Sequence, residues 1–146
     1  MIVPLLQGLK LTLKFFFTKK ITLRYPEEKW EVARRWRGRH VLTVHPDGKI
    51  RCVACMLCAT VCPAECIAIE AAAEEEDNLK YPESYVLDLT RCIFCGQCVQ
   101  VCPKQAIEMT TAYELSEYSR EALILDKEAL LRPPVERYAS KKRKAG

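Results

Sequence analysis

Two stretches of sequence decide the fold: RCVACMLCATVCP at residues 51–63 and RCIFCGQCVQVCP at residues 91–103. Each holds four cysteines with the spacing C-x2-C-x2-C-x3-C, and a proline follows the last one. The second stretch repeats the first at a constant offset, so that Arg91 stands where Arg51 stands in the first copy. The chain therefore contains a duplicated unit.

Nine cysteines in a chain of 146 residues have two common explanations, a disulfide scaffold or a metal site. Disulfide scaffolds belong to secreted chains that carry a signal peptide. Here the segment 1–20 has lysines within its apolar part and no small-residue cleavage site after it. An odd number of cysteines also leaves one thiol unpaired. We therefore expect a reducing compartment and metal-bound thiolates.

The cysteine spacing is that of bacterial [4Fe–4S] runs, in which the fourth cysteine ligates the other cluster of a two-cluster protein. Thiolates are soft ligands that suit such clusters. A zinc site is the alternative, but zinc takes paired C-x2-C units with four ligands per ion, which leaves the crossed pattern unexplained. The predicted ligands are Cys52, Cys55, Cys58 and Cys102 for cluster one, and Cys92, Cys95, Cys98 and Cys62 for cluster two.

The ninth cysteine, Cys66, has no counterpart in the second copy, where Ala106 holds the equivalent position. We expect Cys66 to be a small apolar side chain that packs beside cluster one. The alternative is a spare thiol that replaces a lost ligand or reacts with an oxidant.

Short apolar runs of strand character flank each cysteine loop. They precede the loops at residues 40–44 and 85–89 and follow them at residues 66–70 and 106–109. The pattern predicts a strand, a cysteine loop with a short helical turn, and a second strand, twice over. The predicted fold class is α+β, a duplicated two-[4Fe–4S] ferredoxin fold of the bacterial type over residues 41–110.

The remaining segments have their own patterns. The acidic linker at residues 70–84 predicts a solvent-facing loop or short helix. Residues 113–131 predict a helical turn or two that stops before Pro133 and Pro134. We therefore divide the chain into an arm at residues 1–40, the cluster domain, and an extension at residues 111–146 that ends in a disordered basic tail.

Residues 1–17 predict an amphipathic helix with a basic flank. Its apolar residues fall within an arc of about 120° at the helical period, while Leu11 and Phe15 lie on the far side. The longest uncharged run within this segment, Met1–Leu9, is far shorter than the roughly 20 residues that span a bilayer. Such a helix suits a membrane interface, and packing on its own domain or on a partner subunit is the alternative.

Charge is unevenly distributed along the chain. Residues 1–40 hold ten Lys and Arg against three Glu, and residues 65–89 hold eight acidic residues against one Lys. The tail at residues 137–146 holds five Lys and Arg and no acid. Basic ends around an acidic middle indicate anionic partners at the ends, such as lipid headgroups or acidic proteins. A nucleic-acid sensor that contains a cluster is a further interpretation, but the basic ends are the only feature that favours it. We therefore expect no nucleic acid to bind.

The sequence shows no catalytic constellation. His40 and His45 flank a predicted strand, and a single histidine in such a place is expected to be structural. There is no Walker loop and no G-x-G-x-x-G, so we expect no directly bound nucleotide and no catalytic residue. The chain is therefore expected to carry electrons without a substrate pocket of its own.

The chain resembles the two-[4Fe–4S] ferredoxin-like subunit of respiratory complex I, the proton-pumping NADH:quinone oxidoreductase. The resemblance extends beyond the cysteine runs to about Leu131, and Phe94 stands where this family commonly has an aromatic residue. The segments that carry it are ITLRYPEEK (21–29), RWRGRHVL (35–42), YVLDLTRCIFCGQC (85–98) and YELSEYSREALILDKEALL (113–131).

This resemblance implies a non-catalytic relay subunit that passes electrons along the peripheral arm toward the cluster next to the quinone site. It implies other peripheral-arm and membrane-arm subunits as partners. It also implies a peripheral place on the cytoplasmic side of a bacterial inner membrane. The alternatives are the homologous relay subunit of a membrane hydrogenase or of another donor:quinone oxidoreductase, and a soluble two-cluster ferredoxin.

Overall fold

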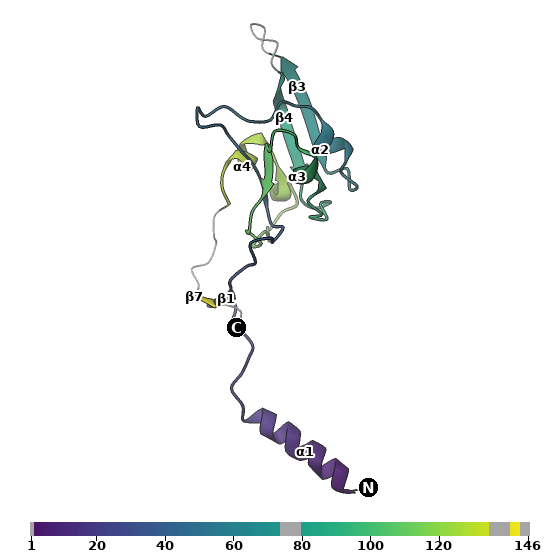
Figure 1. Ribbon diagram of the computed structural model, residues 1–146, viewed down its shortest axis with the longest axis vertical. Helices are drawn as coiled ribbons and strands as arrows, with labels where there is room; N and C mark the ends of the chain where they lie inside the picture. The colour runs from purple at the N-terminus through teal and green to yellow at the C-terminus, as the bar shows by residue number, and fades with distance from the viewer. Residues whose placement is uncertain (1, 74–79, 135–140, 144–146) are drawn as a thin grey trace. The chain divides into compact units, whose positions relative to one another are not determined.

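The computed structural model describes residues 2–73, 80–134 and 141–143 (Figure 1). The chain divides into two compact units. One consists of Met1–Glu31 with Tyr138–Gly146, and the other of Val32–Arg137. The second unit contains both cysteine runs.

The strands of the second unit pair between the two copies of the repeat. β2 (His40–Leu42), before the first cysteine loop, pairs antiparallel with β5 (Ile107–Met109), after the second loop. β3 (Ile67–Ala73), after the first loop, pairs antiparallel with β4 (Lys80–Asp88), before the second. β6 (Ile124–Leu125) adds to the outer side of β4. The predicted alternation of strand and cysteine loop is confirmed.

The register of the two pairings follows the repeat. Leu42 lies opposite Ile107, and Leu87 lies opposite Ile67. Ile107 follows Ile67 at the same offset as the cysteines of the two copies. Leu87 follows Leu42 at a slightly larger offset, because a longer turn precedes the first loop. The two halves of the unit are thus equivalent, and both strands of each half pair with strands of the other.

Each cysteine loop ends in a short helix, α2 (Leu57–Thr60) in the first copy and α3 (Gln97–Val101) in the second. The residue before each helix is left-handed: Met56 has a φ of 62° and Gly96 a φ of 78°. A left-handed residue turns the chain sharply, and glycine adopts this conformation without the penalty that a side chain brings.

The core is formed by the inward residues of the strands and by α4 (Lys127–Leu131). Leu87 and Leu130 are fully buried. Asp126 caps α4 by accepting a hydrogen bond from the Ala129 N–H at 2.7 Å, which satisfies a donor that the first helical turn leaves free. Arg39 donates to the carbonyl of Ala129 at 2.7 Å and so ties the start of β2 to the end of α4.

Two segments differ from the prediction. The acidic linker was expected as a loop or helix, but residues 70–73 and 80–84 continue β3 and β4 as a hairpin, and residues 74–79 lie outside the described part. Cross-strand pairing overrides the helical propensity of Ala and Glu in this segment. A register shift after Glu70 accommodates Pro82, which has no N–H to donate. In the C-terminal segment, the 3-10 turn η1 (Glu121–Leu123) and α4 confirm the predicted helical turns, while β6 was not predicted.

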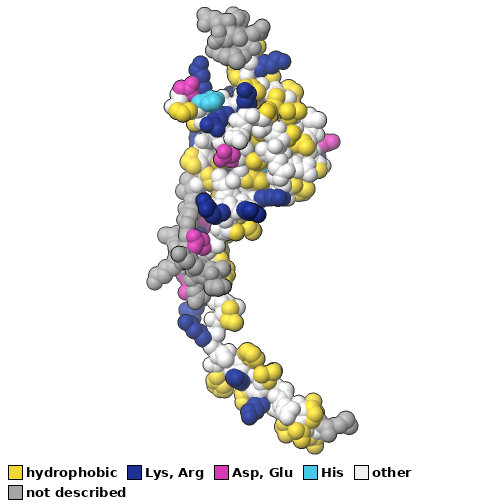
Figure 2. Space-filling model, viewed as in Figure 1, with side chains coloured by type: hydrophobic (Ala, Val, Ile, Leu, Met, Phe, Trp, Pro, Cys, Tyr) yellow, Lys and Arg dark blue, Asp and Glu magenta, His cyan; other side chains and the backbone are white. Residues whose placement is uncertain are grey.

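The first unit contains the predicted helix, α1 (Ile2–Phe16). Every side chain of α1 is exposed within the chain, including Leu9 at 66% and Phe16 at 80%. Figure 2 shows hydrophobic side chains along this helix with Lys and Arg side chains among them. None of the helices in the described part of the chain could span a bilayer.

The first unit also contains β1 (Glu28–Trp30), which pairs parallel with β7 (Lys141–Arg143). The predicted disorder of the basic tail is therefore wrong for these three residues, because their backbone joins that of another strand. The neighbouring tail residues 139–140 and 144–146 lie outside the described part.

Candidate iron–sulfur cluster sites

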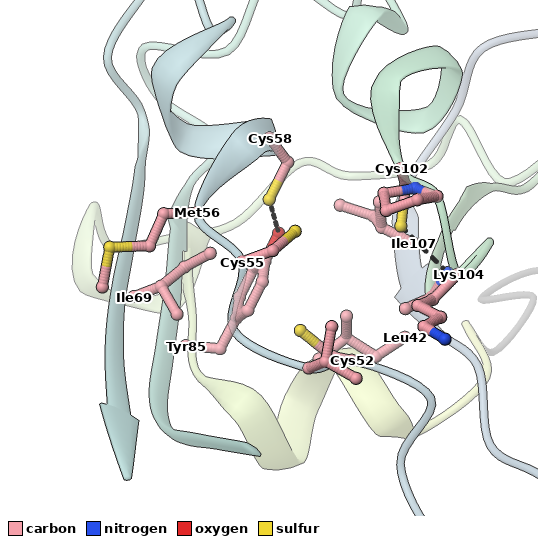
Figure 3. Close-up of a pocket in the computed structure, with 13 residues that line it drawn as sticks. Leu42, Cys52, Cys55, Met56, Cys58, Ile69, Tyr85, Cys102, Lys104 and Ile107 are labelled. Atoms are coloured by element: carbon pink, nitrogen blue, oxygen red, sulfur yellow. Dashed lines mark hydrogen bonds between the residues drawn. The ribbon is translucent and has the colours of Figure 1, made fainter. Parts of the chain in front are cut away.

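The structure gathers the predicted ligands of cluster one around a single cavity, which we call cavity one (Figure 3). Apart from the cysteines, nearly all of the side chains that line it are apolar. Three of its cysteines come from the first loop and one from the end of α3 in the second copy. They are Cys52, Cys55, Cys58 and Cys102.

The predicted ligands of cluster two gather around a second cavity, cavity two. Its composition mirrors that of cavity one. Three of the predicted ligands come from the second loop and one from the segment after α2 in the first copy. They are Cys92, Cys95, Cys98 and Cys62.

The backbone of the two loops repeats as closely as their cysteines do. Ala54 and Phe94 hold equivalent positions in the two copies, and both are left-handed, with φ of 48° and 54°. The pair Glu65 and Gln105, just after the proline turn of each copy, is left-handed as well. A non-glycine residue in this conformation costs of the order of 1–3 kcal/mol, so the surroundings must hold it in place. In a cysteine loop these left-handed residues let the backbone curve tightly, so that successive thiols point toward one centre.

Backbone N–H groups point at the cysteine sulfurs. The Phe94 N–H lies 3.4 Å from Cys92 Sγ, and the Ala106 N–H lies 3.2 Å from Cys102 Sγ. Such donors stabilise negative charge on sulfur and tune the potential of a bound cluster.

Burial opposes ionisation of the thiols in the absence of a cation. Burial raises the pKa of Cys98 to about 11, and it also raises the pKa of Cys52, Cys58 and Cys92. Deprotonated cysteines in these cavities therefore need positive charge at the centre, which iron supplies. The donor set fits an iron–sulfur cluster.

A single metal ion would need its sulfur ligands close together. Four sulfurs on one tetrahedral zinc ion would lie about 3.8 Å apart, given a Zn–S distance of about 2.3 Å. Among the described residues, no three His, Cys, Asp or Glu side chains lie close enough to hold one ion. The cysteines instead stand around the walls of their cavities, as ligands at the corners of a cluster do.

Cys66 does not lie where the sequence analysis placed it. It is buried in the wall of cavity two, not beside cavity one, and its Sγ lies 3.4 Å from Cys62 Sγ. The reason is the crossing of the chain. Cys62 already belongs to the second cavity, and the residues that follow it run along the same wall into β3.

Sequence reasoning missed two buried rings at the cavities. Tyr85 is 1% exposed and lines cavity one, with its hydroxyl 3.5 Å from Cys58 Sγ (Figure 3). His40 is also 1% exposed and lines cavity two, and its ring packs on Phe94 with the centroids 5.8 Å apart. Burial lowers the pKa of His40 to about 4. A signal for these two residues was present in the sequence. His40 and Tyr85 are the first residues of the equivalent segments HVL (40–42) and YVL (85–87), each of which precedes a cysteine loop.

The chain matches known proteins over most of its length. Residues 51–112 match the 4Fe-4S dicluster domain family, which confirms the predicted cofactor, two [4Fe–4S] clusters. NADH-quinone oxidoreductase subunit I 1 of Geobacter sulfurreducens is 53% identical over 131 residues, 90% of this chain and 98% of that protein. NADH-quinone oxidoreductase subunit I 2 of Geobacter metallireducens is 50% identical over the same shares of both chains.

A solved structure shares the fold as well. It is that of the membrane-bound sulfane sulfur reductase, an archaeal respiratory membrane complex. One of its chains matches with a TM-score of 0.55 and 32% identity, over 76% of this chain and 55% of that one.

Proposed function

This chain belongs to the family of NADH-quinone oxidoreductase subunit I, and we propose that it is the two-cluster electron relay of such a complex. In this role it passes electrons from the NADH side toward the cluster next to the quinone site. The observation that carries the proposal is the crossed composition of the cavities. Each combines three cysteines of one copy with the fourth cysteine of the other.

The proposed ligands follow from that composition. When bound, the clusters supply reversible one-electron oxidation and reduction. The chain supplies soft ligands, an apolar wall that excludes water, and N–H donors to sulfur, which together set the potential. Cluster one is held by Cys52, Cys55, Cys58 and Cys102, and cluster two by Cys92, Cys95, Cys98 and Cys62.

The proposal assigns a role to each part of the chain. Residues 41–110 form the cluster domain, residues 1–40 a docking arm, and residues 111–146 an extension. The exposed apolar side chains of α1, with Lys10 and Lys14 beside them, suit the interface between an anionic lipid surface and neighbouring subunits. The proposed location is peripheral, on the cytoplasmic side of a bacterial inner membrane, with peripheral-arm and membrane-arm subunits as the proposed partners.

A second candidate is the equivalent relay in a different respiratory membrane complex. The match to a chain of the sulfane sulfur reductase supports it. The two candidates differ in what supplies the electrons, so purification of the intact complex separates them. An NADH- and flavin-binding subunit in that complex favours the first candidate, and its absence favours the second.

The experiment that tests the relay itself is iron and acid-labile sulfide analysis of the anaerobically purified chain, with low-temperature EPR before and after dithionite. About eight of each per chain, with two interacting signals on reduction, is the expected result. Zinc without sulfide would overturn the proposal.

A further inference from the structure

The buried side chain of His40 has a polar atom that lacks a partner in the part of the chain that the structure describes. It is 1% exposed, and its Nδ1 finds no hydrogen-bond partner among the described residues. Buried polar groups are nearly always hydrogen-bonded, because water lost on burial must be replaced. An orphaned atom beside a cofactor cavity therefore points to the cofactor as its partner.

The surroundings of His40 limit what that partner can be. The ring lines cavity two, and every other side chain in that wall is a cysteine or is apolar. The side-chain acceptors on offer there are sulfur atoms. In the proposed holoprotein these are the thiolates of cluster two and its bridging sulfides, which carry the negative charge of the cluster.

Cavity one contains the same arrangement with its contact already formed. Tyr85 holds the place in β4 that His40 holds in β2, since residues 85–87 and 40–42 are equivalent in the repeat. The Tyr85 hydroxyl lies 3.5 Å from Cys58 Sγ. A thiolate bound to iron only accepts, so the hydroxyl is the donor. The two copies thus place one buried donor at each cavity, a phenol at one and an imidazole at the other.

The position of His40 is well held. Its ring packs on Phe94, which lies between two cysteines of the second loop. The preceding residue, Arg39, donates to the carbonyls of Ala129 and Arg132 at the end of α4. The ring contact and the anchored neighbour both limit the movement of the His40 side chain.

We infer that His40 donates a hydrogen bond from its imidazole to a sulfur of cluster two and thereby raises the reduction potential of that cluster. Reduction adds negative charge to the cluster, and a donor to sulfur stabilises the more negative state. His40 is a positioning residue that binds no iron. The inference rests on the proposed ligation of cluster two.

The first test uses the full chain labelled with ¹⁵N only at histidine. The chain has two histidines, His40 in the cavity wall and His45 in an exposed turn. Pulsed EPR of the reduced protein should show a ¹⁵N hyperfine coupling. The coupling should persist in His45→Gln and vanish in His40→Phe. A reduced cluster signal with no ¹⁵N coupling in the wild type overturns the inference and leaves the relay intact, whereas loss of iron and sulfide from the wild type overturns the relay itself.

The second test measures potentials by EPR-monitored redox titration. His40→Phe should lower the reduced-to-oxidised ratio of one cluster by up to about tenfold at a fixed potential, which is about 59 mV for one electron. His40→Asn, which restores an N–H donor near Nδ1, should recover much of the shift. Tyr85→Phe should shift the other cluster instead. Unchanged potentials in His40→Phe with eight irons retained would overturn the inference.

Discussion

Cys62 and Cys66, four residues apart, bring their sulfur atoms to within 3.4 Å of each other in the wall of cavity two. Only the first belongs to the eight predicted ligands. The second copy has Ala106 in place of Cys66, so cavity one has no such contact. The two cavities are therefore built alike but surrounded differently, and the differences can be tested one at a time.

Cys66→Ala is expected to keep both clusters, with about eight irons per chain, because the eight predicted ligands remain. The Cys66 thiol is a weak donor placed at Cys62. Its removal should lower the potential of cluster two, with a smaller change in the reduced-to-oxidised ratio than the tenfold change expected for His40→Phe. Cys66→Ser should restore part of the shift. Iron analysis and redox titration check both points. Loss of four irons from Cys66→Ala would show that Cys66 is a ligand.

The crossed ligation predicts which cysteine variants resemble one another. Cys102→Ala and Cys52→Ala should damage the same cluster and leave the same EPR signal, although the two residues lie in different copies. Cys92→Ala should leave the other signal. If Cys102→Ala resembled Cys92→Ala, each copy would hold its own cluster and the crossed assignment would be wrong.

Lys104 adds a charge to cavity one that cavity two does not have. It lies in the wall beside Cys102, and Ala64 holds the equivalent place in cavity two. Its ammonium should stabilise the reduced cluster, so Lys104→Ala is expected to lower the potential of cluster one. Because the side chain is exposed, the shift should shrink as salt is added. The matched gain of charge, Ala64→Lys, should raise the potential of cluster two, and redox titrations at low and high salt measure both.

The exposed helix α1 should direct membrane binding through one face. Leu9→Glu places a charge on the apolar face, and burial of one leucine side chain is worth about 1.5–3 kcal/mol. We expect it to weaken co-sedimentation of the loaded chain with anionic vesicles by at least tenfold. Leu11→Glu adds the same charge on the far side of the helix and serves as the control. Deletion of residues 2–17 should abolish binding and keep both clusters.

Equal weakening by Leu9→Glu and Leu11→Glu would show that net charge, not an apolar face, controls the binding. Unchanged vesicle binding after the deletion would move the membrane contact to another part of the chain.

Gly38 is expected to tolerate no side chain. A Cβ at this position would meet the carbonyl oxygens of Ala112 and Thr110, and the Gly38 N–H already donates to Thr110 at 2.8 Å. Gly38→Ala must push apart two backbone segments that hold β2 in place, at a cost of at least about 1–3 kcal/mol. The measurement is the thermal midpoint of the cluster-loaded chain. Gly8→Ala in α1, with open space around it, is the control and should not lower the midpoint.

The sequence by itself determined the repeat, the cofactor class and the family. Cysteine spacing is a local property, because ligands so close in sequence can wrap one cluster only through a tight loop of the kind seen here. The same holds for α1, whose apolar period is readable without any partner. The strands at residues 40–42 and 107–109 were also predictable, since apolar runs flank each loop.

The tertiary structure alone decided what surrounds each cavity. The acidic linker became a hairpin because a partner strand was available, which no local pattern records. Cys66 lies at cavity two, and His40 and Tyr85 face different cavities, because strands of one copy pair with strands of the other. Those contacts join residues that are far apart in the chain. Which residues line each cavity therefore depends on which strands pair, and not on any single stretch of sequence.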